Sequence, residues 1–384
     1  MKAPPAVNPR QTLRVTESGA GGLAARRQAH SDVSSAASAL DDDELGERVL
    51  ASEQLRRSPW AASHRIEIAG RPAFVKRLPL TSVEQAHPYA TRNHFGLPTY
   101  YSYGVGSAGF GAYRELASHV RTTGWVLEGT ILSFPLLHHA RVMPRAPLSS
   151  QGPSPLDSYL ARWNSNAAVG RYVRARNEGH HELWLVVECL PHTVGRWLPA
   201  NQGAVGPVID QLCRTISFLR AHGIVHFDAH LWNVLTDGAQ VYLTDFGLLL
   251  DPEFDLSARE RGFLATHSHY DYGEVIASLG SLLLGMVAAL DATEQERLRA
   301  KYRIASDALP HLVLQRLVDR IDEVHLDKDL PLGREVAEAA ARYRDVIVFM
   351  STFLTTQQRN PRKDTPYDDT RLKELLDAVG ILAP

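Results

Sequence analysis

Three oxygen-bearing side chains near the middle of the chain are spaced so that they could carry out chemistry together. Asp228 is followed five residues later by Asn233, and Asp245 opens an Asp-Phe-Gly triplet. Phosphoryl transfer from ATP depends on positioning and on Mg²⁺, which prefers oxygen ligands, and it needs a carboxylate that orients the acceptor hydroxyl. Asn233 and Asp245 can supply the metal ligands and Asp228 the carboxylate. The spacing therefore indicates ATP- and Mg²⁺-dependent transfer of a phosphoryl group to a hydroxyl.

A single lysine upstream is a further candidate. Lys76 is the only lysine between Lys2 and Lys301, in a chain that otherwise uses arginine for positive charge. Arginine would be the default on a surface strand, whereas a compact ammonium suits the α and β phosphates of a nucleotide. We therefore predict that Lys76 binds the nucleotide and takes part in catalysis.

Hydrophobic periodicity predicts the elements that position these residues. Residues 64–69 alternate, a turn follows at 70–72, and alternation resumes at 73–78, which predicts two strands with Lys76 on the second. The stretch 91–110 is rich in Gly and Tyr without a steady period, and we interpret it as an ordered insertion. Further predictions are helices at 41–53, at 112–120 (ending before Gly124) and at 156–176, strands at 125–132 and 183–188, and a loop at 142–155.

These elements predict an α+β fold with two lobes, the first small and β-rich and the second mainly helical. We expect an N-terminal lobe with insertions at 41–190, the core of the helical lobe at 191–290, and a helical C-terminal extension at 291–384. Residues 1–40 lack the apolar run of a signal peptide and have a composition typical of disorder.

Residues 219–228, together with Asn233 and the triplet at 245–247, resemble the catalytic loop and the metal-binding triplet of the protein-kinase-like superfamily. His230 stands where aminoglycoside phosphotransferases often have histidine, so the resemblance is to an atypical bacterial branch near the aminoglycoside and choline phosphotransferases. It implies that Asp228 orients the acceptor and takes its proton, with His230 as a further catalytic candidate, and that Asn233 and Asp245 hold Mg²⁺.

The same resemblance implies a nucleotide site around Lys76. The expected helical partner of Lys76 is Glu115, although the insertion makes the interval about twice the usual one. Adenine would meet the backbone of the segment after the strand at 183–187, at Glu188 and Leu190, with Cys189 between them.

Two further residues bear on the regulation and on the support of the loop. Phe227 stands where regulated protein kinases carry an arginine that pairs with a phosphorylated activation segment, and phenylalanine cannot make that pair. The family also places an aspartate at the start of a large core helix to hold the catalytic-loop backbone. Asp271 is preferred for this role over Asp255, because a long apolar helix follows Asp271 at once.

The stretch 56–63 departs from the family pattern. The family has a glycine-rich loop over the phosphates there, and this chain has no glycine in that stretch. Either Ala61, Ala62 and Ser63 form a tighter cover over the nucleotide, or nucleotide binding is weakened and the protein is a pseudokinase. We favour activity, because Lys76 and the three catalytic and metal residues all remain.

Composition excludes several other classes. A formal net charge of -2 gives no basic field for nucleic acid. The two cysteines, Cys189 and Cys213, are too few for a disulfide framework and suit a cytoplasmic location. The longest apolar stretch, 275–290, is shorter than the roughly 20 residues that span a bilayer, so membrane insertion is not expected. His267 and His269 resemble a metal pair but have no third ligand nearby in the sequence.

The acceptor is less constrained than the reaction. A protein Ser/Thr hydroxyl is our first expectation, since the insertion and the C-terminal helices offer docking surface. A small-molecule acceptor of the aminoglycoside or amino-alcohol type is the alternative, and the segment between Gly247 and Asp271 is short for a peptide platform. A pseudokinase that acts as a binding module is the third reading, and the oligomeric state stays open.

Overall fold

The structure, a computed structural model, describes residues 19–57, 61–104, 106–145 and 155–382. The prediction of disorder at 1–40 is wrong for most of its length, because residues Gly19–Ala39 form a helix, α1. Residues 1–18 lie outside the described part. α1 has Val33 and Ala37 fully buried against the first sheet, and this packing orders a stretch whose composition alone is typical of disorder.

The first lobe is built on a five-stranded antiparallel sheet with the order β1-β2-β3-β5-β4. The predicted strand pair is confirmed: β2 and β3 pair directly, joined by Ala69 and Gly70, which both have positive φ (52° and 69°). Such a two-residue turn matches the twist of the strands it joins. The strands are β1 Glu53–Arg57, β2 Ala62–Ile68, β3 Arg71–Leu80, β4 Leu137–Pro144 and β5 His181–Glu188.

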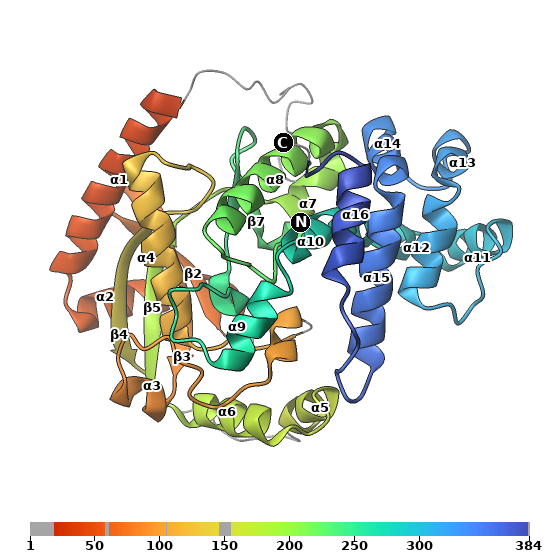
Figure 1. Cartoon of the computed structure of the whole chain (residues 1–384). Helices are drawn as coiled ribbons and strands as arrows, with labels where there is room; N and C mark the ends of the chain where they lie inside the picture. The colour runs from red at the N-terminus through yellow and green to blue at the C-terminus, as the bar shows by residue number, and fades with distance from the viewer. Residues whose placement is uncertain (1–18, 58–60, 105, 146–154, 383–384) are drawn as a thin grey trace.

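Helices cover both faces of this sheet (Figure 1). In β5, Trp184 and Val186 point to the face covered by α1 and α2 (Asp42–Leu50), while Leu183 and Leu185 point to the face covered by α4 (Ala112–Glu128). Side chains alternate along a strand, so one strand serves two cores. α2 begins at the predicted place, where Asp41 and Glu44 form a capping box.

The predictions for the segment after Gly124 and for the loop at 142–155 are wrong. Residues 125–132 do not form a strand, because α4 continues through Gly124 to Glu128 and ends at Gly129 in a left-handed conformation (φ 81°). An added Cβ at Gly124 would meet nothing within 4 Å, and a single glycine inside a helix costs only about 1 kcal/mol. The strand that pairs with β5 at this edge of the sheet is β4, Leu137–Pro144, which extends into the first residues of the predicted loop at 142–155. Residues 146–154 lie outside the described part.

The helix expected at 156–176 is two helices. α5 (Pro155–Arg162) and α6 (Ala167–Glu178) are separated where Asn164 and Ser165 take positive φ (52° and 50°). Asn166 then caps α6 by accepting bonds from the backbone N–H groups of Ala168 and Val169.

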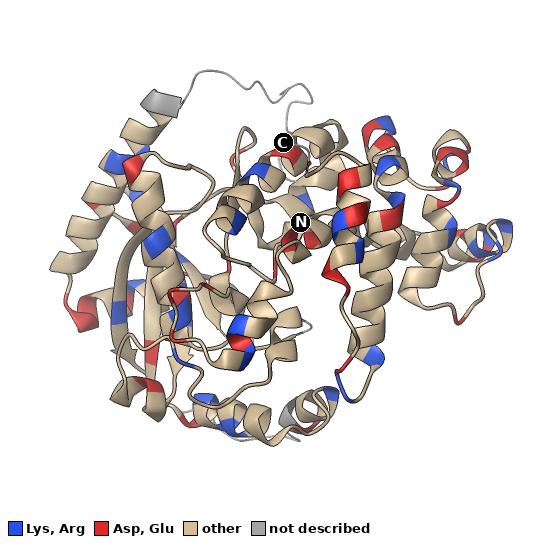
Figure 2. Cartoon of the chain, viewed as in Figure 1, with Lys and Arg blue, Asp and Glu red and all other residues tan. Residues whose placement is uncertain are grey.

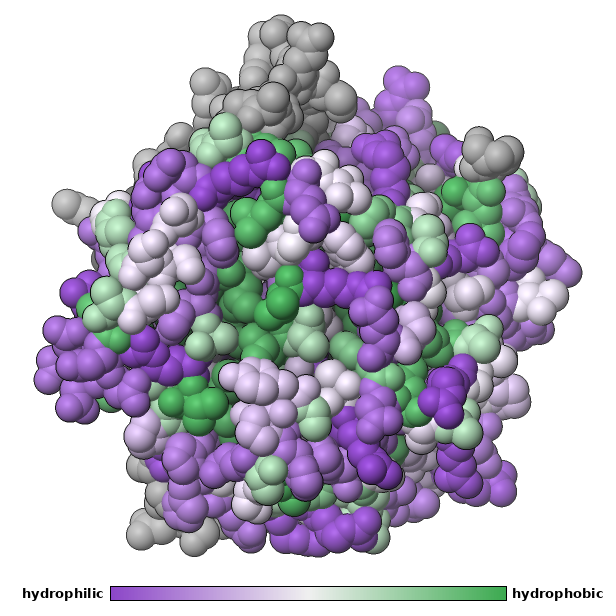
Figure 3. Space-filling view, turned by 60° about the vertical axis from the view of Figure 1, so that its left-hand side comes forward, coloured by the Kyte–Doolittle hydropathy of each residue, from purple (hydrophilic) through white to green (hydrophobic). Residues whose placement is uncertain are grey.

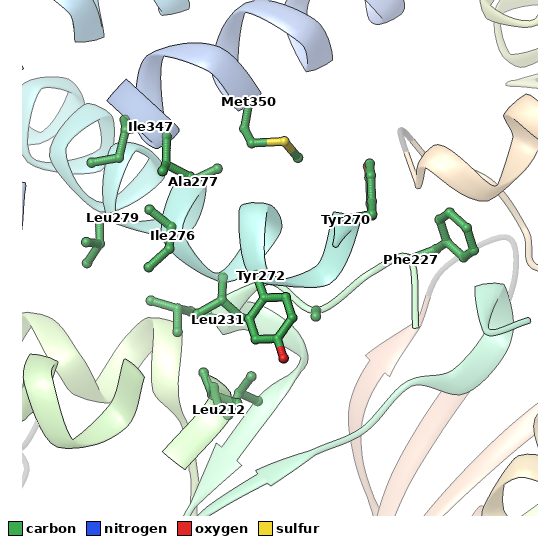
Figure 4. Packing of buried hydrophobic residues seen from close by; sticks show 14 of the residues in the cluster. Leu212, Phe227, Leu231, Tyr270, Tyr272, Ile276, Ala277, Leu279, Ile347 and Met350 are labelled. Atoms are coloured by element: carbon green, nitrogen blue, oxygen red, sulfur yellow. The ribbon is translucent and has the colours of Figure 1, made fainter. Parts of the chain in front are cut away.

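The second lobe is helical around α10 (Tyr270–Ala289), with a small sheet of β6 (His192–Thr193), β7 (Val234–Thr236) and β8 (Val241–Leu243). Figure 4 shows α10 between Leu212 on one side and Ile347 and Met350 on the other. The remaining helices are α3 Ser82–Ala86, α7 Val194–Trp197, α8 Val205–Ala221, α9 Ala258–Ala265, α11 Ala292–Lys301, α12 Pro310–Val318, α13 Ile321–Leu326, α14 Arg334–Arg342, α15 Arg344–Arg359 and α16 Asp369–Ala378.

The C-terminal helices share the core of this lobe. Gly273 and Gly280 of α10 let α15 and α16 approach closely, since an added Cβ at Gly273 would lie 2.7 Å from the sulfur of Met350 and 2.9 Å from Leu372. By length and composition α10 could also cross a membrane, but 67% of its most apolar window is buried inside the protein. It is therefore a core helix, as the sequence indicates.

The molecular surface carries mixed charge. Lys and Arg are interspersed with Asp and Glu over the helices seen in Figure 2. On the face drawn in Figure 3, apolar residues gather toward the middle and hydrophilic residues surround them.

Candidate active site

Lys76 is held between two carboxylates. β3 points its side chain toward α4, where Nζ lies 2.5 Å from Oε1 of Glu115 and 2.8 Å from Oδ1 of Asp245. The structure thus brings together the three residues that the sequence assigns to the nucleotide phosphates and the metal, although the insertion separates Lys76 from Glu115. Glu115 is buried, whereas 43% of the Asp245 side chain is exposed.

The charges in this group stabilise one another. Burial lowers the pKa of Lys76, but Asp245 and Glu115 more than offset that effect and raise it, so the ammonium stays protonated. For Asp245, burial raises the pKa, and the Lys76 ammonium overrides it and lowers the pKa to about 2. Asp245 is therefore a carboxylate at neutral pH, the form that can bind a cation.

Asp245 owes its position to an unusual backbone. Its φ is 68°, and the following Phe246 is fully buried, with its ring centroid 4.7 Å from that of His119. Left-handed backbone at a residue other than glycine is costly and persists where its surroundings enforce it, as they often do at functional sites. The buried Phe246 anchors the turn, while the Asp245 side chain stays partly exposed.

One face of α10 holds the catalytic loop. Asp271 accepts hydrogen bonds from the backbone N–H groups of His226 (2.7 Å) and Phe227 (2.8 Å). One turn on, Glu274 accepts from the N–H of Ala229 (2.7 Å), and a turn later the Ser278 hydroxyl accepts from the N–H of Leu231 (3.2 Å). Three acceptors spaced i, i+3 and i+7 lie on one helix face and support successive residues of the loop.

Sequence reasoning found Asp271 and missed the other two acceptors. Their signal was present, since Glu274 and Ser278 are polar residues at helical spacing within an otherwise apolar stretch. Asp255, the rival candidate, is exposed and does not hold the loop. Burial raises the pKa of Asp271 to about 7, even though its two backbone donors lower it.

Asp228 is oriented by Asn233 and His230. The Asn233 amide nitrogen donates to Oδ2 of Asp228 (2.7 Å) and to its backbone carbonyl (3.1 Å), so the amide oxygen remains as the group that could bind a cation. Nε2 of His230 lies 3.3 Å from Oδ1 of Asp228. Burial lowers the pKa of His230, but the hydrogen bond and charge of Asp228 raise it to about 9. A protonated His230 therefore faces Asp228 at neutral pH.

The donor set fits Mg²⁺ shared with a nucleotide. The backbone N–H of Thr244, next to Asp245, donates to the carbonyl of Asn233 (3.0 Å), which ties the two predicted ligands together. Within the described residues no group of three His, Cys, Asp or Glu side chains could hold a metal ion by itself. Mg²⁺ commonly binds one or two protein oxygens and completes its shell with phosphate oxygens and water, so an amide oxygen and a carboxylate suffice.

The end of β5 is tied to the N-terminal helix. Arg26 of α1 donates to both carboxylate oxygens of Glu188 (2.6 and 3.0 Å) and to the carbonyls of Leu132 and Phe134. The backbone N–H of Glu188 donates to the carbonyl of Leu136 (2.8 Å) and is not free to meet adenine, unlike the expectation. Sequence reasoning missed Arg26 because it lies in the stretch predicted to be disordered.

The half-buried Leu190 lies two residues beyond β5. Its role toward the base stays a prediction.

The glycine-free stretch is only partly described, since residues 58–60 lie outside the described part. Ala62 and Ser63 belong to β2 and do not form a loop; Ser63 pairs with Lys76 across the strands. Directly paired residues of neighbouring strands share a face, so the small Ser63 side chain lies beside Lys76. Ala61 directly precedes the strand.

The described residues of the insertion, 91–104 and 106–110, reach the catalytic loop. An added Cβ at Gly104 would lie 2.9 Å from Oδ1 of Asp228, and one at Gly109 would lie 2.9 Å from the carbonyl of Gly247. Nothing in the sequence pattern identifies these contacts, because they join segments that lie far apart along the chain.

An aromatic cluster surrounds Phe227, and its members come from the insertion, the catalytic loop, the segment after Gly247, α10 and the C-terminal extension. Phe227 is fully buried, with ring centroids 5.2 Å from Phe263 and 5.3 Å from Tyr270. The members are Tyr103, Phe227, Phe263, His267, Tyr270, Phe353 and Tyr367.

His267 and His269 therefore have structural roles. Nε2 of His267 lies 2.7 Å from the Tyr103 hydroxyl, and Nδ1 of His269 lies 2.7 Å from Oδ2 of Asp369.

Comparisons with known proteins agree with a kinase relationship at a general level. No family model matches the chain. The chain is similar to the serine/threonine-protein kinase PKH2 of Saccharomyces cerevisiae, with 29% identity over 153 residues. The match covers 32% of this chain and 14% of the yeast protein. This similarity, together with the mixed α+β architecture, supports a protein-kinase-like phosphotransferase in general terms.

Proposed function

We propose that this protein transfers the γ-phosphoryl group of ATP, in the presence of Mg²⁺, to a hydroxyl. The observation that carries the proposal is the position of Lys76, which is bonded to Glu115 and to the half-exposed Asp245. The Lys76 ammonium lowers the pKa of Asp245 to about 2 while 43% of its side chain stays exposed, so a charged carboxylate is accessible to a cation.

Each residue has a role in this reaction. The Lys76 ammonium binds the α and β phosphates, and Asn233 and Asp245 hold Mg²⁺, which supplies positive charge next to the phosphate oxygens. Asp228 orients the acceptor hydroxyl and accepts its proton, while the protonated His230 limits the build-up of negative charge near the transferred group. Glu115 keeps Lys76 in place and charged.

The acceptor has two candidate classes. A serine or threonine hydroxyl of a protein is favoured by the similarity to a yeast enzyme described as a serine/threonine-protein kinase. A small-molecule hydroxyl is favoured by the contact of Gly104 with Asp228, which narrows the approach to the carboxylate. A cytoplasmic location, where ATP is available, belongs to the same proposal.

The opposing hypothesis is a pseudokinase that binds partners without turnover, and the stretch before β2 without glycine motivates it. Purified protein would be incubated with γ-labelled ATP, Mg²⁺ and a pool of hydroxyl acceptors (Ser/Thr peptides, sugars and amino alcohols) beside Asp228→Ala, with Asp255→Ala as a matched surface control. We expect ADP formation that falls about 10²–10⁴-fold in Asp228→Ala and is unchanged in Asp255→Ala. Equal turnover by the wild type and both variants, or no turnover by any of them, would contradict the proposal that the protein is an enzyme.

A further inference from the structure

Arg26 of α1 joins three segments that come from different parts of the chain. Its guanidinium donates to both carboxylate oxygens of Glu188 and to the backbone carbonyls of Leu132 (2.9 Å) and Phe134 (2.6 Å). Its central carbon also lies 5.1 Å from the ring centroid of Tyr242, in β8 of the second lobe. One side chain therefore contacts the end of β5, the connection between α4 and β4, and the second lobe.

The connection between α4 and β4 makes a direct hydrogen bond with β8. Between the two carbonyls that accept from Arg26, the carbonyl of Ser133 accepts from the backbone N–H of Leu243 (2.9 Å). The side chain of Phe134 is fully buried, and its ring centroid lies 6.1 Å from that of Phe246. Arg26 thus holds this connection at the place where it contacts β8 and the metal-binding triplet.

β8 positions both predicted metal ligands. Leu243, the last residue of β8, lies two residues before Asp245. The N–H of Thr244, between them, donates to the carbonyl of Asn233 (3.0 Å). A shift of β8 against the first lobe would therefore move both ligands relative to Lys76, which belongs to β3. Substitution of residues that orient metal ligands typically lowers metal affinity about 10–100-fold.

The contacts of Arg26 are shielded from water. Only 14% of its side chain and 18% of the Glu188 side chain are exposed. Oε2 of Glu188 also accepts from the backbone N–H of Leu136 (3.1 Å), so the carboxylate is fixed from two directions. Bidentate, charge-assisted hydrogen bonds are strong and directional, and the planar fork of arginine is suited to them. Arg26 is therefore held in one orientation.

The rest of α1 attaches Arg26 to the first lobe, where α1 lies beside α4 and β4 (Figure 1). Val33 and Ala37 are buried against the sheet. Arg141 of β4 donates to the carbonyls of Ala37 (3.2 Å) and Leu40 (2.7 Å). These contacts hold α1 within the first lobe and do not involve β8, so Arg141 provides a matched control for Arg26.

We propose that Arg26 is a positioning residue of the candidate active site. By fixing the connection between α4 and β4 against β8, it keeps Asn233 and Asp245 where Mg²⁺ and the phosphates next to Lys76 require them. The inference rests on the proposed phosphotransferase function. It adds to that function a residue of α1 that lies outside the ion-paired group around Lys76.

Hydrogen exchange tests the contact with β8 without any nucleotide. Purified wild type, Arg26→Met and Arg141→Met would be compared in peptides that cover 241–247, with peptides from α10 as an internal reference. In Arg26→Met the exchange rate at the Leu243 amide should rise about tenfold more than the rates within α10, because Ser133 is no longer held. In Arg141→Met the two regions should change by the same factor. The same factor in both regions of Arg26→Met would overturn the proposal.

Binding of ATP tests the consequence for the metal ligands. The Kd for ATP would be measured with and without Mg²⁺, at a temperature where circular dichroism shows each variant to be folded. Arg26→Met should weaken binding about tenfold with Mg²⁺ and much less without it, because the metal ligands move while Lys76 remains. Arg141→Met should leave both values unchanged. An equal loss with and without Mg²⁺ would indicate a purely structural role and would contradict the proposal.

The wild type in the same experiment separates the two proposals. No binding of ATP by the wild type would overturn the phosphotransferase function, and with it the positioning role. Binding of ATP and Mg²⁺ by the wild type that Arg26→Met leaves unchanged would overturn the positioning role alone.

Arg26→Lys separates charge from geometry. A lysine can still pair with Glu188, but a single ammonium lacks the planar fork that reaches the carboxylate and both backbone carbonyls together. The Kd for ATP with Mg²⁺ should therefore stay close to that of Arg26→Met. A value equal to that of the wild type would show that charge alone suffices and would contradict the assignment.

Discussion

The two sides of the candidate site are held by different forces. On the nucleotide side, Lys76 lies between Glu115 and Asp245 in an ion-paired group that a charged ligand can rearrange. On the acceptor side, the fully buried Phe227 ties the catalytic loop to an aromatic cluster. Incoming phosphate charge can compete for Lys76 but has no comparable effect on buried rings. The side chains on the nucleotide side can therefore rearrange when a charged ligand binds, whereas the positions of the side chains on the acceptor side are fixed by folding.

This difference explains how the loop is ordered without a phosphorylated segment. Where regulated protein kinases carry an arginine, Phe227 packs against Phe263 of α9, in the segment after Gly247. Tyr367 and Phe353 of the C-terminal extension close the same cluster. The extension thus supports the catalytic loop, and no charge needs to be added to form it.

Truncation of Phe227 should have the largest effect. Phe227→Ala leaves a cavity under the catalytic loop and should lower the free energy of unfolding by about 3–5 kcal/mol. Urea denaturation would measure it, with Leu326→Ala as the control, because Leu326 is 74% exposed and should change the free energy by less than about 0.5 kcal/mol. A loss below about 1 kcal/mol would show that the cluster does not hold the acceptor side.

Removal of the charge at Lys76 should break the nucleotide side alone. At ATP concentrations about 100 times Kd, binding adds about 2.7 kcal/mol to the stability of the protein, and Lys76→Met should lose this gain. The double variant Lys76→Met/Glu115→Gln removes the unpaired buried carboxylate as well. Lys76→Met alone leaves Glu115 buried without its cation and should lower the free energy of unfolding measured without ATP. The double variant should recover that free energy, but ATP should still not stabilise it. A response to ATP in either variant would contradict the role of Lys76.

Substitution of Arg26, which joins α1 to Glu188 at the end of β5, should have an effect of intermediate size. Arg26→Met leaves the mostly buried Glu188 carboxylate without its partner and should cost about 1–3 kcal/mol in the free energy of unfolding. The neighbouring Arg27 is exposed and bonds only to the carbonyl of Leu127, so Arg27→Met should have a smaller effect. Equal effects of the two variants would mean that α1 does not support the nucleotide side.

The contribution of His230 to stability should depend weakly on pH. Its pKa is raised from 6.5 to about 9, so the stabilising pair with Asp228 is fully present below pH 6.5 and is lost as the pH rises to about 9. The urea midpoints of the wild type and His230→Gln should therefore differ more at pH 6 than at pH 9.5. Because His230 is partly exposed, the difference should be small, and a difference that grows with pH would contradict the pairing.

The periodicity of apolar residues predicted some elements of the first lobe correctly and others wrongly. The pair β2 and β3 was predicted closely because polar and apolar residues alternate on each side of a turn. The last turn of α4, from Trp125 to Glu128, was predicted as the start of a strand, because Gly124 suggested a helix end and the stretch after it is apolar. Packing of that apolar stretch decided for helix, and a single glycine was not enough to end it.

The sequence by itself determined the chemistry of the catalytic loop. Asp228, Asn233 and Asp245 lie within one short stretch, which folds back on itself through the pairing of β7 with β8, and the isolation of Lys76 marks it in the sequence. Only the tertiary structure decided which distant segments lie against that chemistry. Gly104 reaches Asp228, and Arg26 reaches Glu188 across 162 residues, through contacts set by the packing of whole elements. Local patterns report which face of an element is buried, but not which distant segment covers it.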